Sequence, residues 1–101
     1  MIEVRWTLEA YENLKGIRDV IQRDSEAYAR AVASRLYDAV GILAQYPDSG
    51  RMVPERKDPS LRELVRAPYR IVYRRGADVV EILTIIHGTQ QFPSRLPGAA
   101  G

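Results

Sequence analysis

The apolar and polar positions divide the chain into a short strand, two helices and three further strands. At the start of the chain Ile2, Val4 and Trp6 alternate with Glu3 and Arg5. A period of two is typical of a β-strand that has one face buried. The pattern therefore predicts a first strand that ends at Trp6, an aromatic residue we expect to pack in the core.

Two amphipathic helices are predicted to follow this strand. Apolar residues recur at helical spacing over residues 8–23, directly after Thr7, which is a suitable N-cap. A second helical stripe predicts a helix over residues 26–45, with Ser25 as its N-cap. Pro47 disfavours helical geometry at the residue before it and so limits this helix. Because the connection between the helices is short, they form an antiparallel hairpin.

The remainder of the chain is predicted to be a loop and three strands. Residues 47–60 carry three prolines, a glycine and several charges, which indicates a loop long enough to have a role of its own. Strands are predicted over residues 61–66, 69–75 and 79–86. The last of these is apolar on both faces, apart from Glu81 and Thr84, and such a strand belongs in the interior of a sheet.

This order, β-α-α-β-β-β, predicts an α+β fold. The helix hairpin should pack on one face of a small, mainly antiparallel sheet. With 101 residues the chain is long enough for a single domain, which we place at residues 1–93. The prolines and small residues near the C-terminus predict a flexible tail over residues 94–101.

Alternation along the strand at 69–75 assigns its side chains to two faces. The residues expected beneath the helices are Tyr69, Ile71 and Tyr73. The residues expected on the other face are Arg70, Val72 and Arg74. Because no further helix remains to cover that second face, we predict that it is open to water or to a partner.

Composition excludes several classes of function. The chain has no cysteine, so it has neither disulfides nor cysteine-ligated zinc, and its single histidine, His87, cannot build a histidine-rich metal site. No cofactor or metal is therefore expected. The N-terminus does not resemble a signal peptide, and the apolar runs are too short to span a bilayer, so no membrane association is expected. The net charge of +2 says little about partners.

Two features are candidates for chemistry. Arg70 and Arg74 point the same way on one strand, about 13 Å apart at the backbone, and so present two guanidinium groups to a phosphate or a carboxylate. The alternative is a pair of exposed arginines bridged to acidic neighbours. His87 at the end of the last strand is either a proton shuttle or a hydrogen-bonded structural residue.

The order of motifs resembles the RelE/ParE family of toxins from bacterial type II toxin–antitoxin systems. The run LRELVRAPYRIVYR at residues 61–74 and the run VVEILTIIHG at residues 79–88 are similar to the C-terminal half of these proteins. The segment PDSGRMVPE at residues 47–55 also matches. The resemblance covers residues 2 to about 92. It implies a toxin of the bacterial cytoplasm, associated with growth inhibition and plasmid stabilisation, whose partner is a cognate antitoxin.

The family contains two activities, and the resemblance favours one of them. RelE-like members are ribosome-dependent mRNA endonucleases with catalytic basic residues on the sheet, whereas ParE-like members poison DNA gyrase and lack that set. Here Arg70 matches the family's Tyr-Arg pair, but the positions of the RelE lysines fall on Leu61 and Glu63. The basic residues and terminal tyrosine of RelE-like tails are also missing after His87. The ParE-like gyrase inhibitor, which is no enzyme, is therefore preferred.

Two alternatives stay open. An mRNA endonuclease would use Arg70 and His87, with Arg62 or Glu63 as a third group. A member that has lost its toxicity would only bind its antitoxin. An acidic and apolar antitoxin segment is expected to contact a partner-binding set made of Arg51, Arg66, Arg70, Val72 and Arg74. On this interpretation, Arg70→Ala should reduce activity more than stability.

Overall fold

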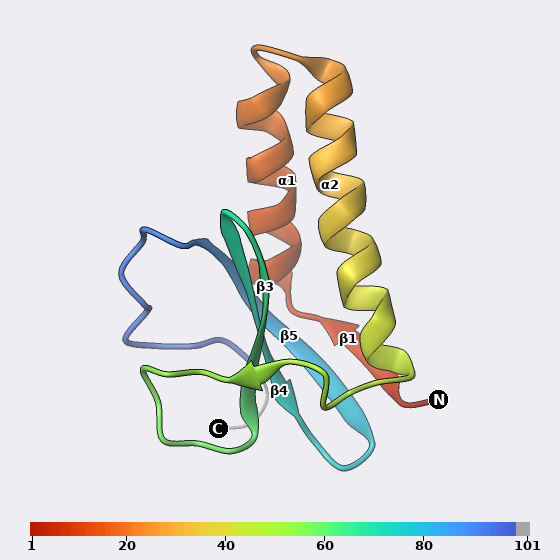
Figure 1. The fold of residues 1–101 in the computed structure, drawn as a ribbon, viewed down its shortest axis with the longest axis vertical. Coiled ribbons are helices and arrows are strands. Elements are labelled where there is room, and N and C mark those ends of the chain that lie inside the picture. Colours follow the sequence, from red (N-terminus) through yellow and green to blue (C-terminus); the bar gives the residue numbers. More distant parts are fainter. Residues whose placement is uncertain (99–101) are drawn as a thin grey trace.

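The computed structural model describes residues 1–98, which form two layers, a helix hairpin and a sheet. The hairpin consists of α1, Leu8–Gln22, and α2, Glu26–Gly41, which lie side by side in Figure 1. A short 3-10 turn, η1, Ile42–Ala44, continues α2. The predicted α+β class and the helix hairpin on a mainly antiparallel sheet are confirmed.

Five strands form the sheet, in the spatial order β1-β5-β4-β3-β2. Their bounds are Glu3–Trp6 for β1, Arg51–Met52 for β2, Leu61–Arg66 for β3, Tyr69–Arg75 for β4 and Val79–His87 for β5. The strand β1 runs parallel to β5, and the other pairs are antiparallel. The interior position predicted for β5 is confirmed. The two-residue strand β2 lies inside the segment predicted as a loop, because two residues are too few to show a period.

Both predicted N-caps are present. The hydroxyl oxygen of Thr7 accepts a hydrogen bond from the Ala10 N–H at 3.1 Å, and that of Ser25 accepts one from the Tyr28 N–H at 3.1 Å. Each bond satisfies an N–H that the first turn of a helix leaves without an internal partner. The second helix leaves α geometry at Gly41, and the 3-10 turn occupies most of the remaining span predicted as helix.

The larger core lies between the hairpin and the sheet. Its fully buried members include Leu36 and Leu43 from the second helical segment and Ile71, Tyr73 and Ile82 from the sheet. This confirms that the Tyr69, Ile71 and Tyr73 face of β4 lies beneath the helices. Trp6 packs against the same core only partly buried, and its ring stacks on the exposed Tyr37 ring at a centroid distance of 6.1 Å.

A β-bulge lets β5 supply apolar residues to both faces. Val72 pairs with Thr84 while the next residue, Tyr73, pairs with Ile82, so Leu83 is one extra residue on β5. Ile82 on one side of the bulge faces the helices, whereas Leu83 packs on the opposite face. The bulge explains why no simple alternation appears in this strand.

The outer face of the sheet is covered, contrary to the expectation that it is open. A second cluster of buried residues occupies it, consisting of Val53, Leu61, Val72 and Leu83, with Phe92 and Leu96 packed against them. The covering residues come from the segment before β3 and from the chain that follows β5 (Figure 1). Two extended segments thus replace the missing helix. The tail predicted over residues 94–101 is described only as far as residue 98, and residues 99–101 lie outside the described residues. The flexibility of this tail stays a prediction.

The side chain of Asn13 joins α1 to the free edge of β5. Pairing between β1 and β5 ends at Ile82, so the next part of the β5 edge has no strand beside it. The Asn13 Oδ1 atom accepts hydrogen bonds from the Ile85 N–H at 3.0 Å and from the Thr84 hydroxyl at 2.8 Å. A polar side chain on α1 therefore substitutes for a strand backbone at this edge.

We predict that Asn13→Ala lowers the free energy of unfolding by about 1–3 kcal/mol, because it leaves a partly buried backbone N–H and a buried hydroxyl without this acceptor. Urea denaturation measures the change. Glu12→Ala, at an exposed neighbouring position on the same helix, is the matched control and should change stability by less than about 0.5 kcal/mol. Equal effects of the two substitutions would contradict the role assigned to Asn13.

Candidate functional site

The candidate site lies on the outer face of the sheet, where β3 and β4 carry a buried ion pair. Glu63 pairs in register with Val72, and both side chains point away from the helices. The Arg70 Nε atom donates a hydrogen bond to Glu63 Oε1 at 2.6 Å. The other carboxylate oxygen, Oε2, accepts one from Arg51 Nε at 2.7 Å. The Glu63 side chain has no exposed surface, so two guanidinium groups neutralise a fully buried carboxylate.

A second carboxylate occupies the rest of the Arg70 guanidinium. The Arg70 Nη1 and Nη2 atoms donate to Glu55 Oε2 and Oε1 at 2.8 and 2.7 Å, which is a bidentate pair. Arg70 is only 9% exposed. Of the two interpretations left open by the sequence, an arginine offered to a ligand or one bridged to acidic neighbours, the second describes Arg70, because Glu55 and Glu63 both bind it.

The charges of this cluster stabilise one another. The hydrogen bond from Arg70 holds the pKa of the Glu55 carboxyl below its ordinary value of 4.5. The same bond raises the pKa of Arg70, against the opposing effect of its burial. Both groups therefore stay charged at neutral pH, and each is bound to the other.

The chain after β5 is fastened beside this cluster. The guanidinium carbons of Arg56 and Arg70 lie 4.8 and 5.4 Å from the centre of the Phe92 ring, which is cation–π distance. Arg56 also donates from Nη2 to the Pro93 carbonyl oxygen at 2.6 Å. The loop before β3 and the segment after β5 are thus held together over Arg70.

Next to the cluster is an open hollow of about 350 Å³. Arg51, Glu55 and Arg70 line one part of it, and Pro54, Val65 and Tyr69 are among the residues that line the rest. A ligand in this hollow would meet the Glu55–Arg70 pair from the solvent side, since the Glu55 side chain is 39% exposed.

Arg74 points to the same face as Arg70 but has its own carboxylate. Its Nη1 atom lies 3.1 Å from Asp58 Oδ2 and 3.1 Å from the Ser60 hydroxyl. The hydrogen bond from the Ser60 hydroxyl, more than that from Arg74, lowers the pKa of Asp58. The two arginines do not present a joint site to one ligand, and the alternative interpretation of arginines bridged to acidic neighbours is the correct one. Val72 between them is fully buried, not exposed.

His87 lies at the end of β5 on the opposite face from Arg70. His87 pairs in register with Tyr69 and Ile86 pairs with Arg70, and neighbouring residues of a strand point to opposite faces. The exposed His87 ring meets the Tyr69 ring edge-on at 5.7 Å, and its Nδ1 atom accepts a hydrogen bond from the Thr89 N–H at 3.1 Å. The structure therefore does not bring His87 and Arg70 together.

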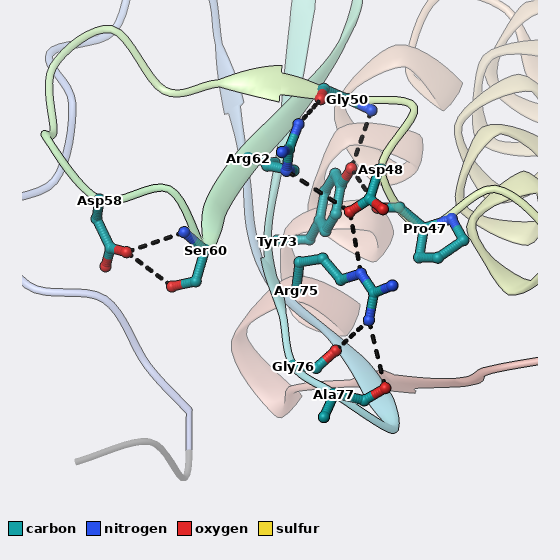
Figure 2. A network of polar contacts seen from close by, with 10 residues as sticks. All are labelled: Pro47, Asp48, Gly50, Asp58, Ser60, Arg62, Tyr73, Arg75, Gly76 and Ala77. Carbon is teal, nitrogen blue, oxygen red and sulfur yellow. Dashed lines mark hydrogen bonds and ion pairs between the residues drawn. The ribbon is translucent and has the colours of Figure 1, made fainter.

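Arg62 belongs to a network of polar contacts that also includes Asp48, Gly50 and Tyr73 (Figure 2). Its Nη1 atom donates to the Gly50 carbonyl oxygen at 2.8 Å, and its Nε atom lies 3.9 Å from Asp48. In the same network the buried Tyr73 hydroxyl donates to the Pro47 carbonyl oxygen at 2.8 Å and accepts from the Gly50 N–H at 2.9 Å. Burial raises the pKa of Tyr73, so this hydroxyl keeps its proton.

Gly50 is required for this packing. A Cβ atom at residue 50 would lie 2.6 Å from the Glu63 carbonyl oxygen and 2.6 Å from the Tyr73 hydroxyl. Any larger residue would push the segment away from β3 and β4. Gly50, in the segment at residues 47–55 that resembles the family, is therefore a close-approach position, and it sets where Arg51 meets Glu63.

The remaining candidates are dispersed. Arg66 pairs with Tyr69 and thus points to the helix side of the sheet, where it borders a hollow beside α2. Arg51 lies on the outer face, and Leu61 is buried in the outer cluster. The predicted partner-binding residues do not form one continuous surface. The sequence missed Glu55 and Phe92, because only the fold of the two covering segments places them against Arg70.

Within residues 1–98 no group of three or more acidic or histidine side chains is arranged to hold a metal ion. Among the same residues, no helix has the length and apolar character needed to cross a membrane.

We predict that Arg70→Ala lowers the free energy of unfolding by about 3 kcal/mol, because it removes one of the two partners of the buried Glu63 carboxylate. This replaces the expectation that the substitution spares stability. Guanidinium denaturation measures the change, and Arg5→Ala is the control. Arg5 binds Glu3 in an exposed pair, whose loss should cost less than about 1 kcal/mol. Similar losses for both variants would show that the Arg70 cluster is not a stabilising element.

We predict a stability loss in acid that depends on Glu55. The pKa of the Glu55 carboxyl is lower in the folded protein than its ordinary value of 4.5. The Glu55–Arg70 pair therefore contributes fully to the free energy of unfolding above pH 4.5, and this contribution is lost as the pH falls through the lower folded pKa. The urea midpoint of the parent should fall over this range more steeply than that of Glu55→Gln. Parallel pH profiles for the two proteins would contradict this assignment.

Comparisons with known proteins agree with the fold and the motifs. The family model described as the ParE toxin of the type II toxin–antitoxin system parDE matches residues 4–92. Putative toxin Y4kP of Sinorhizobium fredii is 47% identical over 95 residues, which are 92% of this chain and 95% of that protein. Toxin RelE2 of Caulobacter vibrioides is 38% identical over 91 residues, covering 89% of this chain and 99% of that protein.

Solved structures share the fold. A chain of the chromosomal ParDE system from P. aeruginosa superimposes with a TM-score of 0.71 at 24% identity, over 86% of this chain and 96% of that one. A chain of the toxin–antitoxin complex RelBE2 from Mycobacterium tuberculosis gives a TM-score of 0.55 at 24% identity, and the match covers 85% of this chain and 96% of that one. The fold, the family model and the relatives together show that this chain belongs to the RelE/ParE family and is a toxin of a type II toxin–antitoxin system.

Proposed function

We propose that this toxin is a ParE-like inhibitor of DNA gyrase, acts in the bacterial cytoplasm, and is neutralised by a cognate antitoxin. The observation that carries the proposal is the occupation of Arg70. All three of its hydrogen-bonding nitrogens donate to the carboxylates of Glu55 and Glu63. Three of the five N–H donors of Arg70 are therefore bound to carboxylates, whose charges compete with the phosphate of an RNA substrate.

The acid–base candidates that the sequence offered for RNA cleavage are not placed to act beside Arg70. The reaction requires a base for the 2′-hydroxyl, stabilisation of charge on the phosphate and an acid for the leaving oxygen. Glu63 is buried between two arginines and Leu61 is buried in the outer cluster, so neither reaches solvent. His87, the natural proton-transfer group, is on the other face of the sheet. A protein that inhibits by binding needs none of these groups.

The relatives support an antitoxin partner but carry names from both branches of the family. The P. aeruginosa structure is a ParDE system and the M. tuberculosis structure is a complex with an antitoxin. For this chain, an acidic and apolar antitoxin segment fits the hollow beside α2, which is bordered by Arg35, Asp38, Ile42 and Arg66. Arg35 and Arg66 each donate a hydrogen bond to a backbone carbonyl oxygen, which is neutral. These bonds leave the charges of both arginines available to acidic side chains of a partner at the border of the hollow.

The target is tested with the purified toxin in two assays. In the first, gyrase, supercoiled plasmid and ATP are incubated with the parent or with His87→Gln, and we expect gyrase-dependent DNA breaks with both proteins, because a gyrase inhibitor has no proton to move. In the second, a translation extract is examined for new mRNA ends, and we expect none. Circular dichroism confirms that the variant is folded.

The reverse result identifies the alternative function. A nuclease that uses His87 for proton transfer should lose about 10²–10⁴-fold in rate in His87→Gln. Ribosome-dependent mRNA cuts by the parent that disappear in this variant would establish an endonuclease like the relative named RelE2.

A further inference from the structure

We propose that Glu55 is the internal occupant of a carboxylate-binding site, and that a glutamate or aspartate on an acidic segment of a partner protein binds Arg70 when Glu55 leaves it. The two carboxylates on Arg70 are not equivalent. Glu63 is on a strand, and its side chain has no exposed surface. Glu55 is on the loop between β2 and β3, and its side chain is 39% exposed. Only Glu55 is able to leave without opening the sheet.

The vacated site would keep its shape and charge. Glu63 would still fix the Arg70 Nε atom, and the Phe92 ring would still lie beside the guanidinium. The Nη1 and Nη2 atoms would then face the hollow as a fork of donors for one carboxylate. A preorganised arginine of this kind loses little side-chain entropy when it binds a ligand.

The surroundings fit a peptide better than a nucleic acid. Of the two arginines that line the hollow, Arg51 pairs its charge with the buried Glu63 through Nε, although its side chain is 62% exposed. Much of the remaining lining is apolar and includes Pro54, Val65 and Pro68. Nucleic acids are held by several cations that neutralise successive phosphates. A single carboxylate flanked by apolar side chains matches both the one arginine fork and the apolar walls.

Glu55 also sets how strongly an outside ligand binds. A tethered group competes at an effective concentration on the order of millimolar, so the intact protein should bind a weak external carboxylate poorly. A partner would overcome this competition by contacts elsewhere on the toxin. This exchange bears on the proposed function, because an Arg70 without Glu55 would also offer donors to a phosphate, and the trinucleotide in the test below separates the two ligands.

The test uses the ¹⁵N-labelled protein and the NMR signal of the Arg70 Nε–H group. The probes are the capped tripeptides acetyl-Val-Glu-Val-amide and acetyl-Val-Gln-Val-amide and a uridine trinucleotide. We expect Glu55→Gln to bind the glutamate peptide at least about tenfold more tightly than the parent does. The glutamine peptide should leave the Arg70 Nε–H signal of this variant unchanged. Asp58→Asn, which removes another loop carboxylate that pairs with a different arginine, Arg74 of β4, should behave like the parent at Arg70.

Two results would overturn the proposal. One is equal affinity of the parent and Glu55→Gln for the glutamate peptide. The other is tighter binding of the trinucleotide than of the peptide to Glu55→Gln, which would make the site one for nucleic acid. If Glu55→Gln does not fold, the exchange is tested in the parent protein by following the pKa of Glu55. Saturating glutamate peptide should raise the pKa of the Glu55 carboxyl, followed by ¹³C NMR, toward its ordinary value, and an unchanged pKa would exclude the exchange.

Discussion

The buried carboxylate of Glu63 is the constraint on which the outer half of this molecule depends. A fully buried charge is tolerated only where opposite charges and hydrogen bonds replace its hydration. Arg70 comes from the neighbouring strand, whereas Arg51 comes from β2, beyond the loop that follows the helices. Satisfying one carboxylate therefore ties β2, β3 and β4 together. It also decides that the arginine most suggestive of catalysis in the sequence serves primarily as a counter-ion.

The same constraint organises the covering of the sheet. Once Arg70 is fixed, Glu55 binds its outer nitrogens and Phe92 lies beside its guanidinium. The segment before β3 and the segment after β5 are thereby positioned over the apolar cluster of Val53, Leu61, Val72 and Leu83. The sheet has a helical layer on one face and two extended segments on the other. Hydrogen bonds from Arg70 to Glu55 and from Arg56 to the Pro93 carbonyl oxygen hold these segments in place, whereas a helix would be held mainly by an apolar stripe.

A shared fold does not fix an activity, and this family illustrates why. The relatives of this chain include proteins named for both RelE-like and ParE-like systems. The two solved structures, one from a ParDE system and one from a RelBE2 complex, share its fold. The resemblance places the catalytic set of RelE-like members at positions 61, 63 and 70. In this chain those positions hold a buried leucine, a buried glutamate and an arginine bound to carboxylates. The chemistry has to be judged from these contacts, because family membership leaves the target open.

Local patterns in the sequence determined the elements and their order, including both N-caps, the hairpin, the interior position of β5 and the helix-facing side of β4. These features depend on neighbours in the chain, so periodicity and capping residues reveal them. Tertiary structure alone decided that the outer face is covered, that Leu83 is a bulge residue, and that Glu55 and Phe92 meet Arg70. The sequence did single out Glu63, because it stands where the resemblance expects a lysine of RelE-like members. Glu55 gave no such signal, because its contact with Arg70 spans fifteen residues of chain and exists only when an aperiodic loop folds back over the sheet.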